Sequence, residues 1–149
     1  MKAKSIKGVS IEEIQSAVQQ SMADGFKPTL AIALVSIKQD RNAICKVLDD
    51  EGITIFGATT NGGFIDDELE PGSAAILLLD MNPDYFTILF EEYPNKNYRE
   101  IAAGMATKTV ERFAHPAFLI RIAGVHIARD QVGRLIEGQV EAATRIQWR

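Results

Sequence analysis

The stretch from Leu30 to Val35 constrains the fold more than any other part of this sequence, because every one of its residues is apolar. A strand with one face in water alternates apolar and polar residues, since successive side chains point to opposite faces. An uninterrupted apolar strand is typical of a sheet whose two faces are both covered. The sequence therefore predicts a buried strand over Thr29 to Val35, at the centre of a layered fold.

Two amphipathic segments on either side of this strand predict helices. The first begins with a capping box, in which Ser10 and Glu13 would satisfy free amides of the opening turn. Asp40 can cap the second helix. Gly25 and Gly52 follow the last periodic positions and are expected to end the two helices. Apolar residues recur at helical spacing, at Ile11, Ile14, Val18 and Met22 in the first segment and at Ile44, Val47 and Leu48 in the second.

Further strands and helices are expected in the rest of the chain. Ile53 to Phe56 is rich in β-branched residues and predicts a second inner strand. Ser73 to Leu79 and Tyr85 to Phe90 are strand-like and flank a turn-like segment, so they predict an antiparallel hairpin. A capping-box pattern from Asn97 to Glu100 predicts a helix. Beyond it, the pattern predicts a strand over Ala117 to Ile122, a helix from Asp130 and a last strand over Thr144 to Trp148.

Helices interleaved with buried strands indicate an α/β fold. The expected architecture is layered, with a mixed, mostly parallel β-sheet, helices on both faces and one β-hairpin. A length of 149 residues suits one domain, residues 1–149. The last predicted strand reaches the final residues without a closing cap, so we expect this domain to be truncated at its C-terminal end.

Composition narrows the class of protein. The net charge of −4 argues against a nucleic-acid partner, which would attract a basic surface. A single cysteine, Cys45, excludes an internal disulfide and fits a reducing compartment. The basic N-terminus is followed by no apolar core of a signal peptide, and no apolar run is long enough to span a bilayer. We therefore expect a cytoplasmic protein without a membrane partner.

A glycine-rich turn from Gly57 to Gly63 follows the second inner strand. Glycines leave backbone amides uncovered, and Thr59, Thr60 and Asn61 add polar side chains. Ligands of α/β sheets bind beyond the carboxyl ends of strands, where this turn is expected to lie. The turn matches neither a dinucleotide fingerprint nor a phosphate-binding P-loop. A turn whose glycines only adopt a positive φ remains the alternative.

The segment from Pro28 to Leu79 resembles the amino-terminal FIST domain, a sensory module of intracellular signal-transduction proteins. That family has a buried strand, a helix, a strand ending in a Gly-x-Ser/Thr-Thr-x-Gly loop, and a later strand of small and aliphatic residues. The corresponding features of this chain are Leu30 to Ser36, Asp40 to Asp50, Gly57 to Gly62 and Ser73 to Leu79.

The resemblance implies non-catalytic binding of a small polar metabolite, with amino acids as candidates. Its partner would be a C-terminal FIST domain or a signalling output domain. Two departures stand against it. The family often has an acidic residue where this chain has Gly63, and it usually continues into a further glycine-rich segment that is absent here.

The predicted ligand site combines this turn with two neighbouring groups. Amides near Thr60 to Gly63 would hold a carboxylate. No Lys or Arg occurs between Lys46 and Lys96, so the surface there is acidic, and either Asp66 or Asp67 could meet an ammonium group. Ser36, at the end of the first buried strand, could face the same pocket. The predicted ligand-binding residues are Thr59, Thr60, Asn61, Gly62, Gly63, Ser36 and Asp66.

No catalytic, metal or cofactor site is predicted. His115 and His126 lack the spacing of a zinc site, and Cys45 has no identifiable base beside it. Two alternatives to a sensor stay open. One is a transferase or hydrolase subunit that uses the same pocket. The other is an interaction module that docks a partner, or a second copy in a homodimer, through an open sheet edge.

Overall fold

The computed structural model describes residues 1–60, 63–65, 68–70, 72–92, 97–114 and 120. The chain divides into two compact units, Met1–Phe86 and Thr87–Arg149, and each is described by itself. The predicted helix from Asp130 and strand over Thr144 to Trp148 lie outside the described residues, as does the predicted strand over Ala117 to Ile122 apart from the exposed Ile120. A single, truncated domain over 1–149 stays a prediction.

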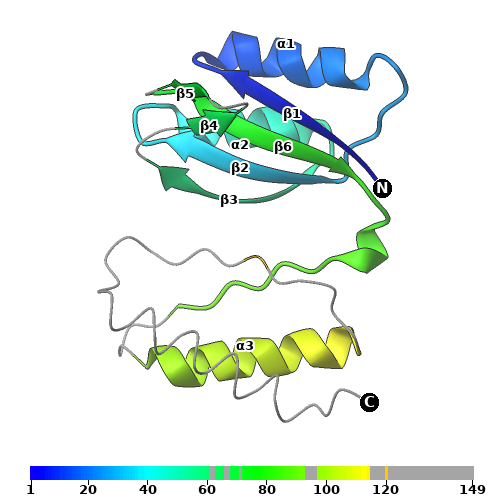
Figure 1. The fold of residues 1–149 in the computed structure, drawn as a ribbon, viewed down its shortest axis with the longest axis vertical. Coiled ribbons are helices and arrows are strands. Elements are labelled where there is room, and N and C mark those ends of the chain that lie inside the picture. Colours follow the sequence, from blue (N-terminus) through cyan, green and yellow to red (C-terminus); the bar gives the residue numbers. More distant parts are fainter. Residues whose placement is uncertain (61–62, 66–67, 71, 93–96, 115–119, 121–149) are drawn as a thin grey trace. The chain divides into compact units, whose positions relative to one another are not determined.

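The first unit alternates strands and helices (Figure 1). Its elements are β1 (Lys2–Gly8), α1 (Ile11–Met22), β2 (Leu30–Ser36), α2 (Arg41–Asp50), β3 (Thr54–Thr60), β4 (Gly63–Ile65), β5 (Glu68–Glu70), β6 (Ala74–Asp80) and the 3-10 helix η1 (Pro83–Tyr85). Among the described residues, β1, β6, β2 and β3 form one sheet in that order, and β4 pairs with β5 in another. The second unit contains α3 (Tyr98–Arg112).

The α/β class and the mixed sheet are confirmed, but the prediction of a mostly parallel sheet is wrong. β6 lies between β1 and β2 and runs antiparallel to both, whereas β2 and β3 are parallel. The sequence argument missed β1 because this edge strand buries only Ile6 and Gly8 among mostly exposed polar residues. Without β1, the antiparallel pairing of β6 with strands from earlier in the chain was not foreseen.

The predicted hairpin between Ser73 to Leu79 and Tyr85 to Phe90 is also wrong. The first segment forms β6, but the second is not a strand. The Asn82 side chain accepts a hydrogen bond from the Asp84 N–H at 3.0 Å and caps the start of η1, so the chain after β6 continues as a 3-10 helix rather than as a hairpin turn. The antiparallel pair of neighbouring strands is instead β4 with β5.

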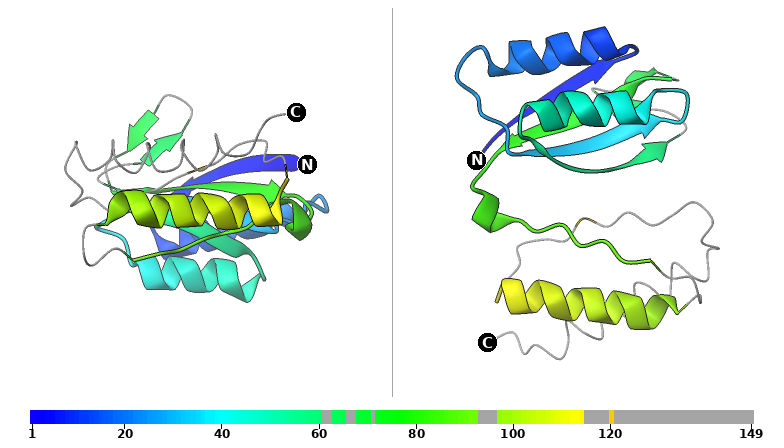
Figure 2. Two further views of the ribbon diagram at one scale, coloured as in Figure 1. Left: turned by 90° about the horizontal axis from the view of Figure 1, so that it is seen from below. Right: turned by 180° about the vertical axis from the view of Figure 1, so that it is seen from behind.

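Both helices of the first unit cover one face of the sheet (Figure 2, right). The prediction of helices on both faces is therefore not met in this unit. The connections β1–α1–β2 and β2–α2–β3 both join parallel strands and advance in the same direction across the sheet. Because such crossovers are right-handed, two that advance in the same direction place their helices on the same side.

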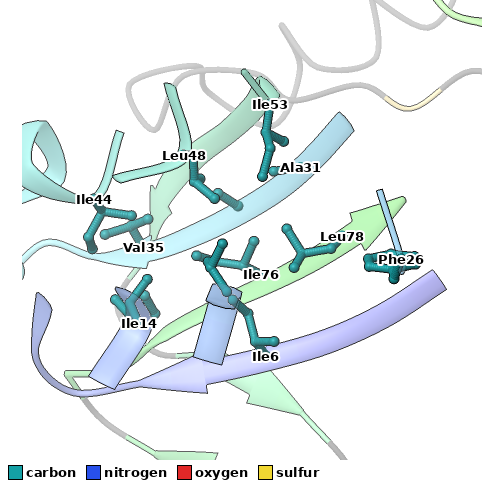
Figure 3. Packing of buried hydrophobic residues seen from close by; sticks show 13 residues of the cluster. Ile6, Ile14, Phe26, Ala31, Val35, Ile44, Leu48, Ile53, Ile76 and Leu78 are labelled. Carbon is teal, nitrogen blue, oxygen red and sulfur yellow. The ribbon is translucent and has the colours of Figure 1, made fainter. Parts of the chain in front are cut away.

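The hydrophobic core lies between these helices and the sheet (Figure 3). Ile14 and Val18 of α1 and Ile44 and Leu48 of α2 are fully buried, which confirms the predicted inner faces of both helices. In Figure 3, Ile44 of α2 lies beside Val35 of β2. Strand residues that alternate along β2 and β6 also belong to the core, namely Ala31, Ala33, Val35, Ala74, Ile76 and Leu78, and so do Ile6, Phe26 and Ile53.

The predicted helix caps of the first unit form. Ser10 Oγ accepts from the Glu13 N–H at 3.2 Å, and Glu13 Oε2 accepts from the Val9 N–H at 2.8 Å. Gly25 and Gly52 follow α1 and α2 with positive φ, as their predicted role requires. The box predicted at α3 is different. Asn97 makes no side-chain cap bond and instead donates to Glu100 Oε2 at 3.4 Å.

Gly57 is required where β2 and β3 approach each other. A Cβ atom at this position would collide with the backbone of Ala33, its partner in the register. We expect Gly57→Ala to lower the free energy of unfolding by about 1–3 kcal/mol, as overpacking does. Urea unfolding followed by circular dichroism measures this change.

Gly104→Ala is the matched control, because a Cβ at Gly104 of α3 would meet no atom within 4 Å. The same chemical change should there stabilise the helix by up to about 1 kcal/mol. Equal effects of the two substitutions would contradict the steric role of Gly57.

Lys4 anchors the end of α1. Its Nζ donates to Asp24 Oδ2 at 2.8 Å and to the Ser21 carbonyl at 2.6 Å, and it lies 5.1 Å from the centre of the Phe26 ring. The hydrogen bond from Lys4 is the largest cause that holds the pKa of Asp24 below its ordinary value. The resulting stabilisation is complete above the unfolded-state pKa and is lost as pH falls through the lower folded-state pKa.

We expect Lys4→Met to raise the pKa of Asp24 toward its ordinary value and to remove this acid-sensitive contribution. A carboxyl-carbon NMR titration measures the pKa directly. Lys46→Met is the control, since it breaks the exposed pair of Lys46 with Asp50 on α2 and should leave Asp24 unchanged. An unaltered Asp24 pKa in Lys4→Met would refute the assigned cause.

Candidate functional site

The parallel strands β2 and β3 end side by side. Ser36 and Thr60 are partners in the register, and the Ile37 N–H donates to the Thr60 carbonyl at 3.1 Å. The chain then leaves β2, and α2 begins at Arg41. The carboxyl ends of two parallel strands and the start of a helix therefore meet, which is where α/β proteins bind ligands.

A shallow depression of about 280 Å³ lies at this position. Its volume is close to the lower limit of small-molecule sites, so it suits a small metabolite better than a nucleotide. Half of the lining residues come from the connection between β2 and α2, two come from the first turn of α2, and one comes from β3. The lining residues are Ile37, Gln39, Asp40, Arg41, Asn42 and Thr59.

The structure separates the predicted site residues that it describes. Thr59 lines the depression and is exposed. Thr60 and Ser36 point to the opposite face, because side chains alternate along a strand and Thr59 pairs with the core residue Val35. Ser36 is only 1% exposed, and its Oγ accepts from the Lys38 N–H at 3.3 Å. Neighbouring residues such as Thr59 and Thr60 thus do not face one pocket.

Part of the predicted glycine-rich turn is strand. β3 continues through Thr60, so Gly57 to Thr60 are strand rather than turn. Gly63 begins β4 and pairs with Glu70. Asn61, Gly62 and Asp66 lie outside the described residues, and their predicted roles stay predictions.

Sequence reasoning missed the residues that contribute most of the lining. Gln39, Arg41 and Asn42 were passed over, and Asp40 was recognised only as a helix cap. A signal was present, since a polar run that ends in a helix cap follows the carboxyl end of a buried strand. The prediction centred instead on the glycines that follow the second predicted strand.

Groups of both charges surround the depression. Asp40 caps α2, with its Oδ1 accepting from the Ala43 N–H at 3.1 Å. The exposed Arg41 follows, and its amide and that of Asn42 belong to the first helical turn, which offers no intrahelical carbonyl to them. These groups can bind a carboxylate through the helix start and a cation through Asp40.

The lining residues are polar or charged apart from Ile37, and none of them carries a thiol or an imidazole. Among the residues that the structure describes, no group of three or more His, Cys, Asp or Glu side chains could hold a metal ion. In the same residues, no helix is both long and apolar enough to cross a membrane.

Comparisons with known proteins assign no family to this chain. No family model matches the sequence, and no curated protein or solved structure matches it either. The likeness to the amino-terminal FIST domain therefore remains a resemblance.

The cap at Asp40 fixes the helix start that borders the depression. We expect Asp40→Ala to destabilise the protein by about 1 kcal/mol, because the Ala43 amide loses its acceptor. Asp40→Asn should change stability by only a few tenths of a kcal/mol, since asparagine caps about as well. Denaturant unfolding of both variants tests this pair, and equal losses would show that charge matters more than the cap.

Proposed function

We propose that this chain is an amino-terminal FIST-type sensory domain that binds a small polar metabolite in the cytoplasm without catalysing a reaction. The observation that carries the proposal is the depression at the carboxyl ends of β2 and β3, lined by polar groups and by charges of both signs. The family resemblance supports the same assignment from the sequence. Amino acids are the favoured ligand class.

The lining supports a zwitterion for electrostatic reasons. A ligand carboxylate could accept from the Arg41 guanidinium and from the amides that open α2. An ammonium group on the same ligand could then contact the Asp40 carboxylate and the Thr59 hydroxyl. A neutral or singly charged ligand would leave one of the two charged side chains without a partner in the complex.

Sensing requires that binding biases a second state of the protein or of its partner. A ligand shifts such an equilibrium only by its differential affinity for the two states. The resemblance supplies the partner class, which is a C-terminal FIST domain or an attached signalling output domain. In a domain that binds without catalysis, the free energy of binding is available for this shift.

One observation favours a second candidate function, docking of a protein partner or a second copy through a sheet edge. β3 ends the described sheet on one side, and its residues carry no charge. Uncharged edge strands are prone to pair with other strands. Co-purification with a partner, without any response to small molecules, would support this alternative over sensing.

A thermal-shift screen against the common amino acids and other small metabolites tests the proposal. At about 100 times its dissociation constant, a ligand should stabilise the folded protein by about 2.7 kcal/mol. For a domain of this size, that corresponds to a rise of several degrees in Tm. A flat response to every compound would speak against sensing.

Matched charge-removing variants locate the binding site. Arg41→Met removes a cation that lines the depression, whereas Lys46→Met removes an exposed cation later in the same helix. We expect Arg41→Met to abolish most of the thermal shift and Lys46→Met to retain it. Equal shifts in both variants would place the ligand elsewhere.

A further inference from the structure

The side chain of Gln39 ties three connections together at one end of the sheet. Its Nε2 donates to the Val9 carbonyl at 2.6 Å and to the Gly72 carbonyl at 2.7 Å, while its backbone N–H donates to the Ser36 carbonyl at 2.9 Å. Gln39 also lines the depression. A ligand there would therefore contact a residue that already holds two distant parts of the chain.

Each of the two carbonyls belongs to a residue that lies just before another helix or strand. Val9 connects β1 to α1, and its own N–H donates to Glu13 Oε2 of the capping box at 2.8 Å. Gly72 precedes β6, and the next residue, Ser73, accepts from the Ser36 N–H at 3.1 Å. Through Gln39, the depression is linked to the start of α1 and to the start of β6.

The two bonds depend on the primary amide of Gln39. The NH₂ group of Gln39 offers two protons, one for each carbonyl. Leucine has a similar size but donates nothing. The bond to Gly72 is partly buried, which limits its replacement by water, whereas the bond to Val9 is exposed.

We propose that Gln39 is a positioning residue that transmits occupancy of the depression to the β1–α1 connection and to the entrance of β6. A regulatory role for this coupling rests on the proposed sensing function. The coupling between the depression and the two connections does not depend on it. A guest that contacts residues 37–42 orders the backbone that carries Gln39. The side chain then holds Val9 and Gly72 more persistently, so both connections open less often.

The first experiment needs no ligand. In Gln39→Leu, amide hydrogen exchange should become several-fold faster at Val9 and Gly72 and their neighbours. The matched control is Thr29→Val at the other end of the sheet, where the Thr29 hydroxyl donates to the Met81 carbonyl at 2.6 Å. That control should speed exchange near Met81 and leave Val9 and Gly72 unchanged. Unaltered exchange at Val9 and Gly72 in Gln39→Leu would overturn the proposal.

The second experiment fills the depression with a covalent guest. In a Cys45→Ser background, Thr59→Cys is alkylated with iodoacetate, so that its thiolate displaces iodide and a carboxymethyl group projects from the lining. We expect alkylation to slow exchange at Val9 and Gly72 when Gln39 is present. The slowing should vanish when Gln39→Leu is added, while exchange at residues 40–42 still slows.

The outcomes separate this inference from the proposed function. Equal slowing at Val9 and Gly72 with and without Gln39, or slowing in neither, would overturn the coupling. Slowing that requires Gln39 supports the coupling even if no metabolite raises Tm, in which case sensing fails alone. A metabolite that raises Tm without any Gln39-dependent change at these two connections supports sensing and overturns the coupling.

Discussion

The close parallel pairing of β2 and β3 is the constraint on which the site depends. It is possible because Gly57 has no Cβ where the Ala33 backbone approaches. The pairing brings the carboxyl ends of the two strands to one edge, where Ile37 bonds to Thr60. The chain leaves β2 at this edge and begins α2 a few residues later. The start of α2 and Thr59 of β3 therefore border one depression. Gly57 was predicted as part of a ligand-binding turn, but its role in the structure is to let β2 and β3 pack closely.

The parts of the fold that the sequence predicts well are those set by nearby residues. The caps at Ser10 and Asp40 and the buried positions Ile14 and Leu48 follow from spacings of three or four residues, which the helix itself imposes. Pairing of β6 with β1 and β2 is different, since it joins segments far apart in the chain. β1 carries mostly exposed polar residues and gives little hydrophobic signal. The hairpin prediction was wrong because it paired β6 with the next segment along the chain, whereas β6 pairs with the distant strands β1 and β2.

The site was predicted only in part, for a related reason. The rule that ligands bind at the carboxyl ends of strands led to Thr59, which lines the depression. Strand alternation, which the same sequence shows, could have separated Thr59 from Thr60 if β3 had been extended beyond Phe56. The role of Gln39 could not be foreseen, because its partners Val9 and Gly72 are remote in sequence and are carbonyl groups that every residue has.

The placement of charge explains why binding and transmission can share one short connection. Asp40 is needed for the helix cap, Arg41 projects into solvent beside it, and Gln39 turns toward the rest of the sheet. In the proposed sensor, these consecutive residues serve helix capping, ligand recognition and coupling. Because they share one backbone, a bound ligand that orders this segment would affect the cap, the recognition groups and the Gln39 bonds together. The proposed sensing function needs this linkage between the depression and the rest of the sheet.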